Sequence, residues 1–160
     1  MRHAQSSWDS PNFSDFDRPL NHRGVKAVPY MARMMNLRKA VPDLILTSPA
    51  RRAEQTAERV KQSGGFAAEI LTERRIYEAA AATLLELVQE IENDFDAVLL
   101  VGHNPGVEGL IKALTGLLRP MTPGALVAVN LNVENWNEIA SDASGKLAFV
   151  IAPKEETSKM

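Results

Sequence analysis

The sequence predicts a single three-layer α/β/α domain with a mostly parallel central sheet. Strand-like and helix-like segments alternate along the chain, which is the pattern of an α/β layer fold. The runs at 43–47 and 97–101 are short and apolar, as in strands buried on both faces. No internal repeat or long linker divides the 160 residues, and this length suits one domain. We therefore assign residues 1–153 to the domain and 154–160 to a polar C-terminal tail.

Local patterns predict the elements in order. Residues 1–17 are polar and rich in Ser, Asp and Asn, which is typical of a loop. Asn21 is suited to cap a helix over 22–37, and Ser48 to cap a second helix that ends near residue 62. The later expected elements are a short strand at 69–71, a helix opened by a capping box at Thr83 and Glu86, a strand at 97–101, a helix over 106–118, and strands at 125–131 and 147–152.

Composition excludes several classes of protein. The net charge of −2 provides no basic field for a nucleic-acid backbone. The absence of cysteine excludes disulfides and thiolate chemistry. No apolar run has the length of a membrane span, and the N-terminus has no secretory signal pattern. We therefore expect a cytoplasmic protein with neither a nucleic-acid nor a membrane partner, and the sequence predicts no oligomeric state.

Two side chains are expected at the carboxyl edge of the sheet. His103 follows the strand at 97–101, and Arg52 lies in the first turn of the helix after the strand at 43–47. Ligands of open parallel sheets bind at this edge, where helix N-termini attract anions. An arginine opposes the helix dipole there, and a bound anion removes that conflict.

Blander interpretations remain open for both residues. Arg52 could form a surface ion pair with Glu54 or Glu58, and His103 could be an ordinary polar residue of a loop. A metal site is disfavoured, because the sequence has neither cysteine nor closely spaced histidines and the arginines would repel a cation. His22 is expected to be an exposed residue of its helix.

Four sequence blocks, in order, carry a resemblance to a known family. They are Arg2-His3-Ala4, Arg18-Pro19-Leu20 with Gly24, Ser48-Pro49-Ala50-Arg51-Arg52-Ala53-Glu54-Gln55-Thr56-Ala57, and Val101-Gly102-His103-Asn104-Pro105. With these blocks the chain resembles the histidine phosphatase superfamily, which has the phosphoglycerate mutase-like fold. The resemblance reaches from Arg2 to Gly106 and implies that this fold covers most of the chain.

The resemblance implies a role for each matching residue. His3 would be the nucleophile that becomes phosphorylated, and Arg2, Arg52 and His103 would hold the phosphoryl oxygens. Glu78, in Ile76-Tyr77-Glu78-Ala79, would be the acid that protonates the leaving oxygen, although a solvent-facing carboxylate is an open alternative. The reaction would need no metal and no other cofactor.

The family places a buried strand before the Arg-His pair, whereas only Met1 precedes it here. Either the natural chain starts earlier, or this version lacks the strand. If the strand is lacking, we expect a gap in the sheet and a poorly held His3.

The short chain looks most like the phosphohistidine phosphatase branch of the family, the SixA type. We therefore expect a phosphohistidine on a protein as substrate. Three alternatives stay open: a small-molecule phosphomonoesterase of the same fold, a non-catalytic phosphate-binding module, and an interaction domain with a vestigial site.

Overall fold

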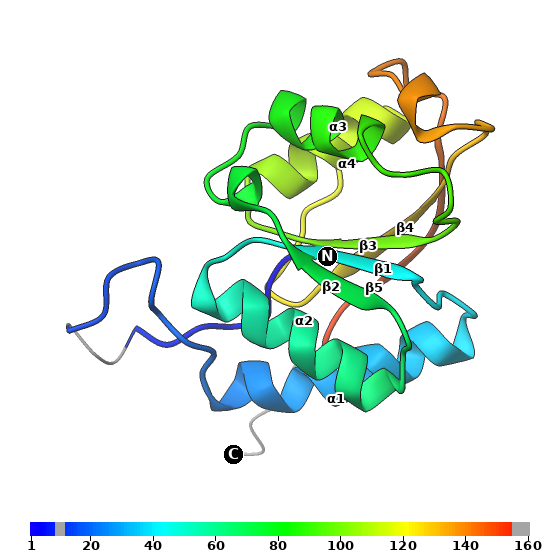
Figure 1. Cartoon of the computed structure of the whole chain (residues 1–160). Helices are drawn as coiled ribbons and strands as arrows, with labels where there is room; N and C mark the ends of the chain where they lie inside the picture. The colour runs from blue at the N-terminus through cyan, green and yellow to red at the C-terminus, as the bar shows by residue number, and fades with distance from the viewer. Residues whose placement is uncertain (9–11, 155–160) are drawn as a thin grey trace.

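Helices cover both faces of a central β-structure, as the sequence predicts for an α/β/α fold. The computed structural model describes residues 1–8 and 12–154. On one face lie α1 (His22–Leu37) and α2 (Arg51–Gly64), and on the other lie α3 (Ala81–Gln89) and α4 (Gly106–Thr115) (Figure 1). Most of the expected tail, 154–160, lies outside the described residues.

The strands form two groups. The parallel group has β1 (Leu44–Thr47) between β2 (Glu69–Thr72) and β3 (Val98–Val101). The other group is the antiparallel pair of β4 (Leu126–Asn130) and β5 (Lys146–Ile151). The three parallel strands end together, so the loops after β1 and β3 meet at one edge.

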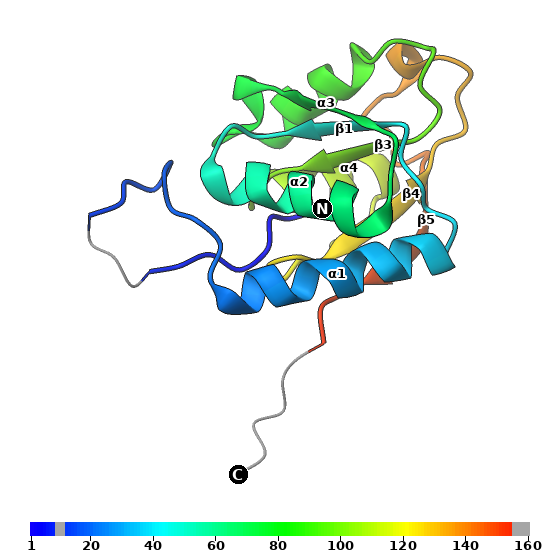
Figure 2. The same ribbon diagram turned by 60° about the horizontal axis from the view of Figure 1, so that its bottom comes forward.

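Two short 3₁₀ helices complete the elements, η1 (Arg74–Ile76) and η2 (Trp136–Glu138). The apolar side chains of α1 and α2 pack with those of β4, β5 and the parallel sheet, and α3 and α4 cover the opposite face. Figure 2 shows α1 running along the β4–β5 pair.

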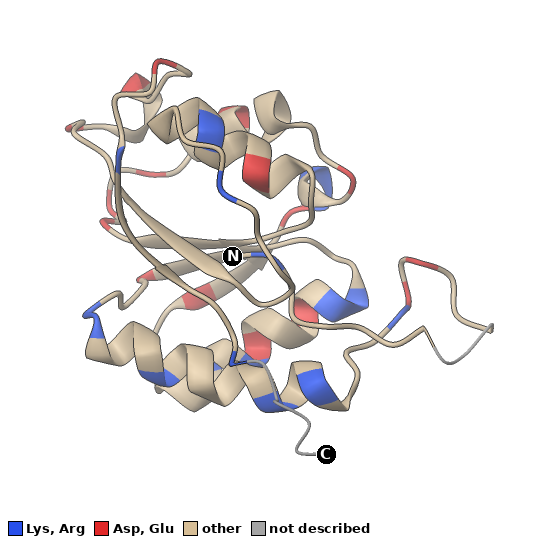
Figure 3. Cartoon of the chain, turned by 180° about the vertical axis from the view of Figure 1, so that it is seen from behind, with Lys and Arg blue, Asp and Glu red and all other residues tan. Residues whose placement is uncertain are grey.

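Figure 3 shows acidic and basic residues interspersed over both helical layers. None of the helices in the described part of the chain is long and apolar enough to cross a membrane.

The first three residues lie between the two groups of strands. Arg2 forms a parallel bridge with Gly102, and the Gly102 N–H donates to the Met1 carbonyl at 3.0 Å. The His3 N–H donates to the Gly102 carbonyl at 3.0 Å, and the Arg2 N–H donates to the Ala125 carbonyl at 3.1 Å. The expectation of a loop from residue 1 is therefore wrong here, because these backbone groups pair as in a strand.

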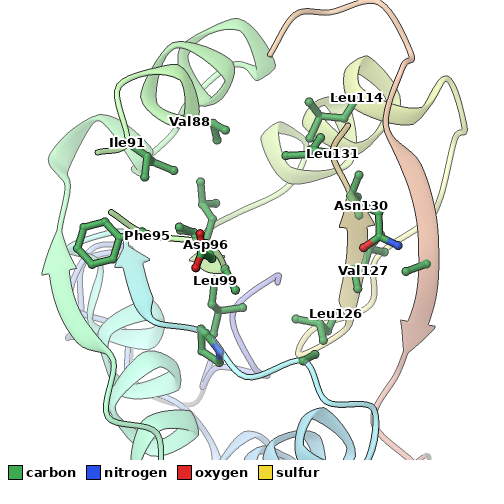
Figure 4. A pocket seen from close by; sticks show the side chains of 18 of the residues that line it. Val88, Ile91, Phe95, Asp96, Leu99, Leu114, Leu126, Val127, Asn130 and Leu131 are labelled. Carbon is green, nitrogen blue, oxygen red and sulfur yellow. The ribbon is translucent and has the colours of Figure 1, made fainter. Parts of the chain in front are cut away.

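A cavity of about 720 Å³ continues this line, between β3 and β4. Figure 4 shows apolar side chains facing it, among them Leu99 from β3 and Leu126 and Val127 from β4. Met1 also lines the cavity, and its buried amino group donates to the Leu100 carbonyl at 2.8 Å. The expected gap in the sheet is thus confirmed.

Several helix boundaries differ from the expectations. Asn21 caps α1 as predicted, and its Oδ1 accepts the Gly24 N–H at 2.9 Å. However, the N-cap position of α2 is Ala50, not Ser48. Helix α3 begins at Ala81, so Thr83 lies inside it and forms no capping box. Helix α4 ends at Thr115, because Gly116 takes a left-handed conformation with φ of 75°.

Candidate active site

His3, Arg52 and His103 meet at the carboxyl edge of the sheet. Arg52 Nε lies 3.3 Å from His3 Nε2, and Arg52 Nη2 lies 3.3 Å from His103 Nδ1. The centroids of the two imidazole rings are 5.1 Å apart. The convergence that the sequence predicts for Arg52 and His103 is therefore present, and His3 joins it.

The hydrogen bonds of His3 define its tautomer. Its Nδ1 lies 2.7 Å from the Ala4 carbonyl, which can only accept, so Nδ1 carries the hydrogen. Nε2 then carries no hydrogen, and its lone pair accepts a hydrogen bond from the Arg52 guanidinium. Burial is the main cause that lowers the His3 pKa to about 3, and the positive charges around it, including Arg52, act in the same direction. His3 is only 7% exposed and its Nδ1 is hydrogen-bonded, so the expectation of a poorly held His3 is wrong.

His103 is also held in its neutral form. Burial first, and then the charge of Arg52, lower the pKa of His103 to about 4. Because its Nδ1 accepts from Arg52, its Nε2 carries the hydrogen and donates to Ser48 Oγ at 2.7 Å. The sequence pattern predicts a helix cap at Ser48 and does not indicate this contact. The only local signal was its position directly after β1.

Arg2 presents a donor without a partner. Its Nη1 donates to the Met121 carbonyl at 2.9 Å. Its Nε is buried and has no hydrogen-bond acceptor among the residues that the structure describes. A buried donor left in this state costs about 1–3 kcal/mol. A bound oxyanion would satisfy it, as expected for a residue that holds a phosphoryl oxygen.

Asp15 and Tyr77 adjoin the site and were missed by sequence analysis. Arg52 Nη1 donates to the Asp15 carbonyl at 2.5 Å, and Arg52 Nη2 donates to the Asp15 carboxylate at 3.1 Å. The Tyr77 hydroxyl donates to the same carboxylate oxygen at 2.6 Å. Asp15 lies in the segment that the sequence presents as a polar loop. No local pattern links it to Tyr77, which is 62 residues away.

Glu78 stands apart from the other expected residues. Its side chain is exposed, and its backbone is left-handed with φ of 55°. Among the described residues it forms neither a hydrogen bond nor an ion pair, although its charge is one of the smaller causes that raise the pKa of Tyr77. Its role as a general acid stays a prediction. Arg51, its side chain also exposed, is turned away from the buried position of Arg52.

The donors of the site suit an anion. The charges of two buried or half-buried arginines, Arg2 and Arg52, both act on the two neutral imidazoles. In the described parts of the chain, no three His, Asp or Glu side chains gather as metal ligands. None of the four expected phosphate-site residues lines the 720 Å³ cavity, so the cavity and the site are separate features.

The sequence profile of the histidine phosphatase superfamily, branch 1, matches residues 1–105. The match covers more than half of the chain, and the chain belongs to this family. The resemblance carried by the four sequence blocks is thereby confirmed.

Solved structures of SixA proteins share the fold. The protein histidine phosphatase SixA in complex with tungstate is 26% identical, with a TM-score of 0.80 over 96% of this chain and 94% of that one. A SixA structure from Agrobacterium tumefaciens is 28% identical, with a TM-score of 0.81 over 96% and 95% of the two chains. An uncharacterised protein of Mycobacterium tuberculosis is 30% identical over 117 residues, which cover 73% of this chain and 71% of that protein.

Proposed function

We propose that this chain is a phosphatase that takes a phosphoryl group from a protein phosphohistidine onto His3 and releases it to water. The observation that carries the proposal is the state of His3, whose unprotonated Nε2 faces Arg52 while its Nδ1–H is held by the Ala4 carbonyl. An imidazole in this state is a competent nucleophile toward phosphorus. The similarity of this chain to SixA proteins supports a phosphohistidine substrate.

In the first step, the lone pair of His3 Nε2 attacks phosphorus, and the P–N bond to the substrate imidazole breaks. The substrate ring, protonated at its other nitrogen, leaves as neutral imidazole. The new phosphohistidine carries a positive ring charge, and the Ala4 carbonyl stabilises it by accepting from Nδ1–H.

The hydrogen-bond donors around His3 stabilise the negative charge on the phosphoryl oxygens. Negative charge spreads over three equatorial oxygens during phosphoryl transfer, so fixed donors aimed at these oxygens lower the barrier. The unpartnered Nε of Arg2 and the edge of Arg52 that faces the imidazoles supply such donors. The charge of a bound phosphoryl group favours the protonated form of His103, whose Nδ1 then also donates.

In the second step, water attacks the phosphorus and the bond to Nε2 breaks. The electron pair returns to Nε2, one water proton goes to solvent, and inorganic phosphate leaves. No metal enters either step. Both exchanges involve an imidazole leaving group, which departs with less assistance than an alkoxide, so an exposed Glu78 suffices for this substrate. An alkoxide leaving group would depend on Glu78 far more strongly.

The experiment compares kcat/KM on a phosphohistidine-bearing protein with kcat/KM on a panel of sugar phosphates. We expect a clear preference for the phosphohistidine protein, together with acid-labile, base-stable phosphate on His3 after rapid quench. A preference for sugar phosphates would support the small-molecule alternative instead. Phosphate that protects against unfolding without any turnover would support the non-catalytic module, with His3→Ala as the matched control.

A further inference from the structure

The guanidinium of Arg52 uses two different edges. Its Nε and Nη2 face His3 and His103, where the proposed phosphoryl group binds. Its Nη1 and Nη2 face Asp15, which accepts with both its backbone carbonyl and its carboxylate. A guanidinium is planar and its donors have a fixed fork geometry, so a group that holds one edge also sets the direction of the other.

Asp15 is itself held in place. The Tyr77 hydroxyl donates to Oδ2 at 2.6 Å, and Arg18 Nη2 donates to Oδ1 at 3.0 Å. The hydrogen bond from Tyr77, followed by those from Arg18 and Arg52, holds the pKa of the Asp15 carboxyl well below its usual range. The carboxylate is charged at neutral pH, and its side chain is 49% exposed.

Backbone contacts fix the segment that carries Asp15. The Arg51 N–H at the start of α2 donates to the Phe16 carbonyl at 3.0 Å. The Phe16 ring meets the Tyr77 ring edge-on, with centroids 5.2 Å apart. The Tyr77 ring in turn meets His103 edge-on at 5.5 Å. The segment thus docks on the same helix terminus that presents Arg52.

We propose that Asp15, oriented by Tyr77, is a positioning residue for phosphoryl transfer: it clamps one edge of Arg52 so that the other edge faces the reacting phosphorus. The inference rests on the proposed function, because it requires the phosphoryl group to bind at Arg52. Asp15 acts through Arg52, since among the described residues it forms no hydrogen bond with His3 or His103. A carboxylate that instead competed with phosphate for Arg52 would have the opposite effect on affinity.

The test compares Asp15→Ala with Asp17→Ala, a matched control in the same segment whose carboxylate accepts from Ser14 and does not contact Arg52. The substrate is p-nitrophenyl phosphate, and the Kd of inorganic phosphate is measured in parallel. Misplacement of a catalytic group by about 1 Å can cost 100-fold. We therefore expect Asp15→Ala to lose about 10- to 100-fold in kcat/KM and to bind phosphate more weakly. Asp17→Ala should stay within about twofold of the parent protein.

A double-mutant cycle identifies the route of the effect. Arg52→Lys keeps the positive charge but lacks the forked guanidinium. In this background, adding Asp15→Ala should lower kcat/KM by less than about threefold. Tyr77→Phe should show a smaller loss than Asp15→Ala, and none beyond it when the two are combined. Thermal melting of each variant confirms that it is folded.

Three results would overturn the inference while leaving the proposed function intact: phosphate binding that tightens in Asp15→Ala, a loss equal in the Arg52→Lys and parent backgrounds, or no difference from Asp17→Ala. Failure of the proposed function looks different. In that case the parent protein itself shows neither turnover nor phosphate binding, and both ideas fall together.

Discussion

At the scale of single residues, the site depends on keeping two imidazoles neutral beside fixed positive charges. Burial and the adjacent arginine lower the pKa of His3 to about 3 and that of His103 to about 4. The ring of His3 therefore stays unprotonated over the whole range in which an ordinary histidine titrates. Its nucleophilic nitrogen is available without a neighbouring base.

This environment predicts the pH dependence of turnover. After correction for ionisation of the substrate, kcat/KM should stay level as the pH falls through 6.5, the ordinary value for histidine, and decline only near pH 3, where His3 becomes protonated. The sign follows because protonation removes the nucleophile, and the lowered pKa delays protonation to more acidic solution. The measurement is the steady-state pH profile of kcat/KM, which reports ionisations of the free enzyme. A decline centred near pH 6.5 would contradict the prediction.

Two adjacent arginines provide a test of side-chain placement. Arg52→Ala should lose more than about 100-fold in turnover, since it removes donors for the developing charge, and His103→Ala should do the same. The neighbouring Arg51 is exposed, and Arg51→Ala should change turnover by less than about twofold. Steady-state kinetics on the three variants decide the point. Losses below tenfold for both Arg52→Ala and His103→Ala would argue against their assigned roles.

At the scale of elements, the two groups of strands leave a place for one more. The edges of β3 and β4 are not paired with each other, and Met1, whose amino group is buried, lines the cavity between them. Burial lowers the pKa of this amino group to about 5, which reflects the cost of placing a charge there. A peptide N–H at the same position would donate to Leu100 without that cost.

A strand added ahead of Met1 should therefore stabilise the protein. A Val-Thr-Val-Leu-Val extension joined to Met1 should raise Tm by at least about 2–4 °C, equal to about 1 kcal/mol, because it pairs both edges and fills the apolar cavity. An extension of five Gly and Ser residues is the matched control and should have little effect. Equal Tm values for the two extended proteins, measured by calorimetry, would show that the cavity does not accept a strand.

At the scale of the whole molecule, two buried groups and the half-buried His103 link stability to pH. Folding lowers the pKa values of the Met1 amino group, His3 and His103 from 8.0, 6.5 and 6.5 to about 5, 3 and 4. Between each pair of values the unfolded chain binds the proton and the folded chain does not. Stability must therefore fall as the pH falls through these ranges.

Thermal melting at several pH values tests this linkage. Tm should decline as the pH is lowered from 8 toward 4, and His103→Gln should make the decline less steep below pH 6.5. His22→Gln is the control, because His22 is exposed on α1. A Tm that rises on acidification over this range would reverse the sign of the predicted linkage.

Local sequence patterns predict the layered α/β class, the cap at Asn21 and the positions of the five strands along the chain. These depend on local periodicity and capping chemistry, which neighbouring residues carry. The sequence also placed Arg52 and His103 at one edge, since parallel strands bring their following loops together. The starts of α2 and α3 were harder to predict, because Ser48 and Thr83 have side chains that suit a cap, yet the N-cap positions are Ala50 and Ala80.

The assembly of the site depends on contacts between distant parts of the chain, which local sequence patterns do not predict. The pairing of Met1 and His3 with residues near Gly102 depends on backbone groups about 100 residues apart, and so does the cavity beside them. The same holds for the hydrogen bonds of Ser48 with His103 and of Asp15 with Tyr77. Such contacts are set by which surfaces pack together. No local pattern of charge or hydrophobicity encodes them, and the direction of the Arg52 guanidinium follows from them.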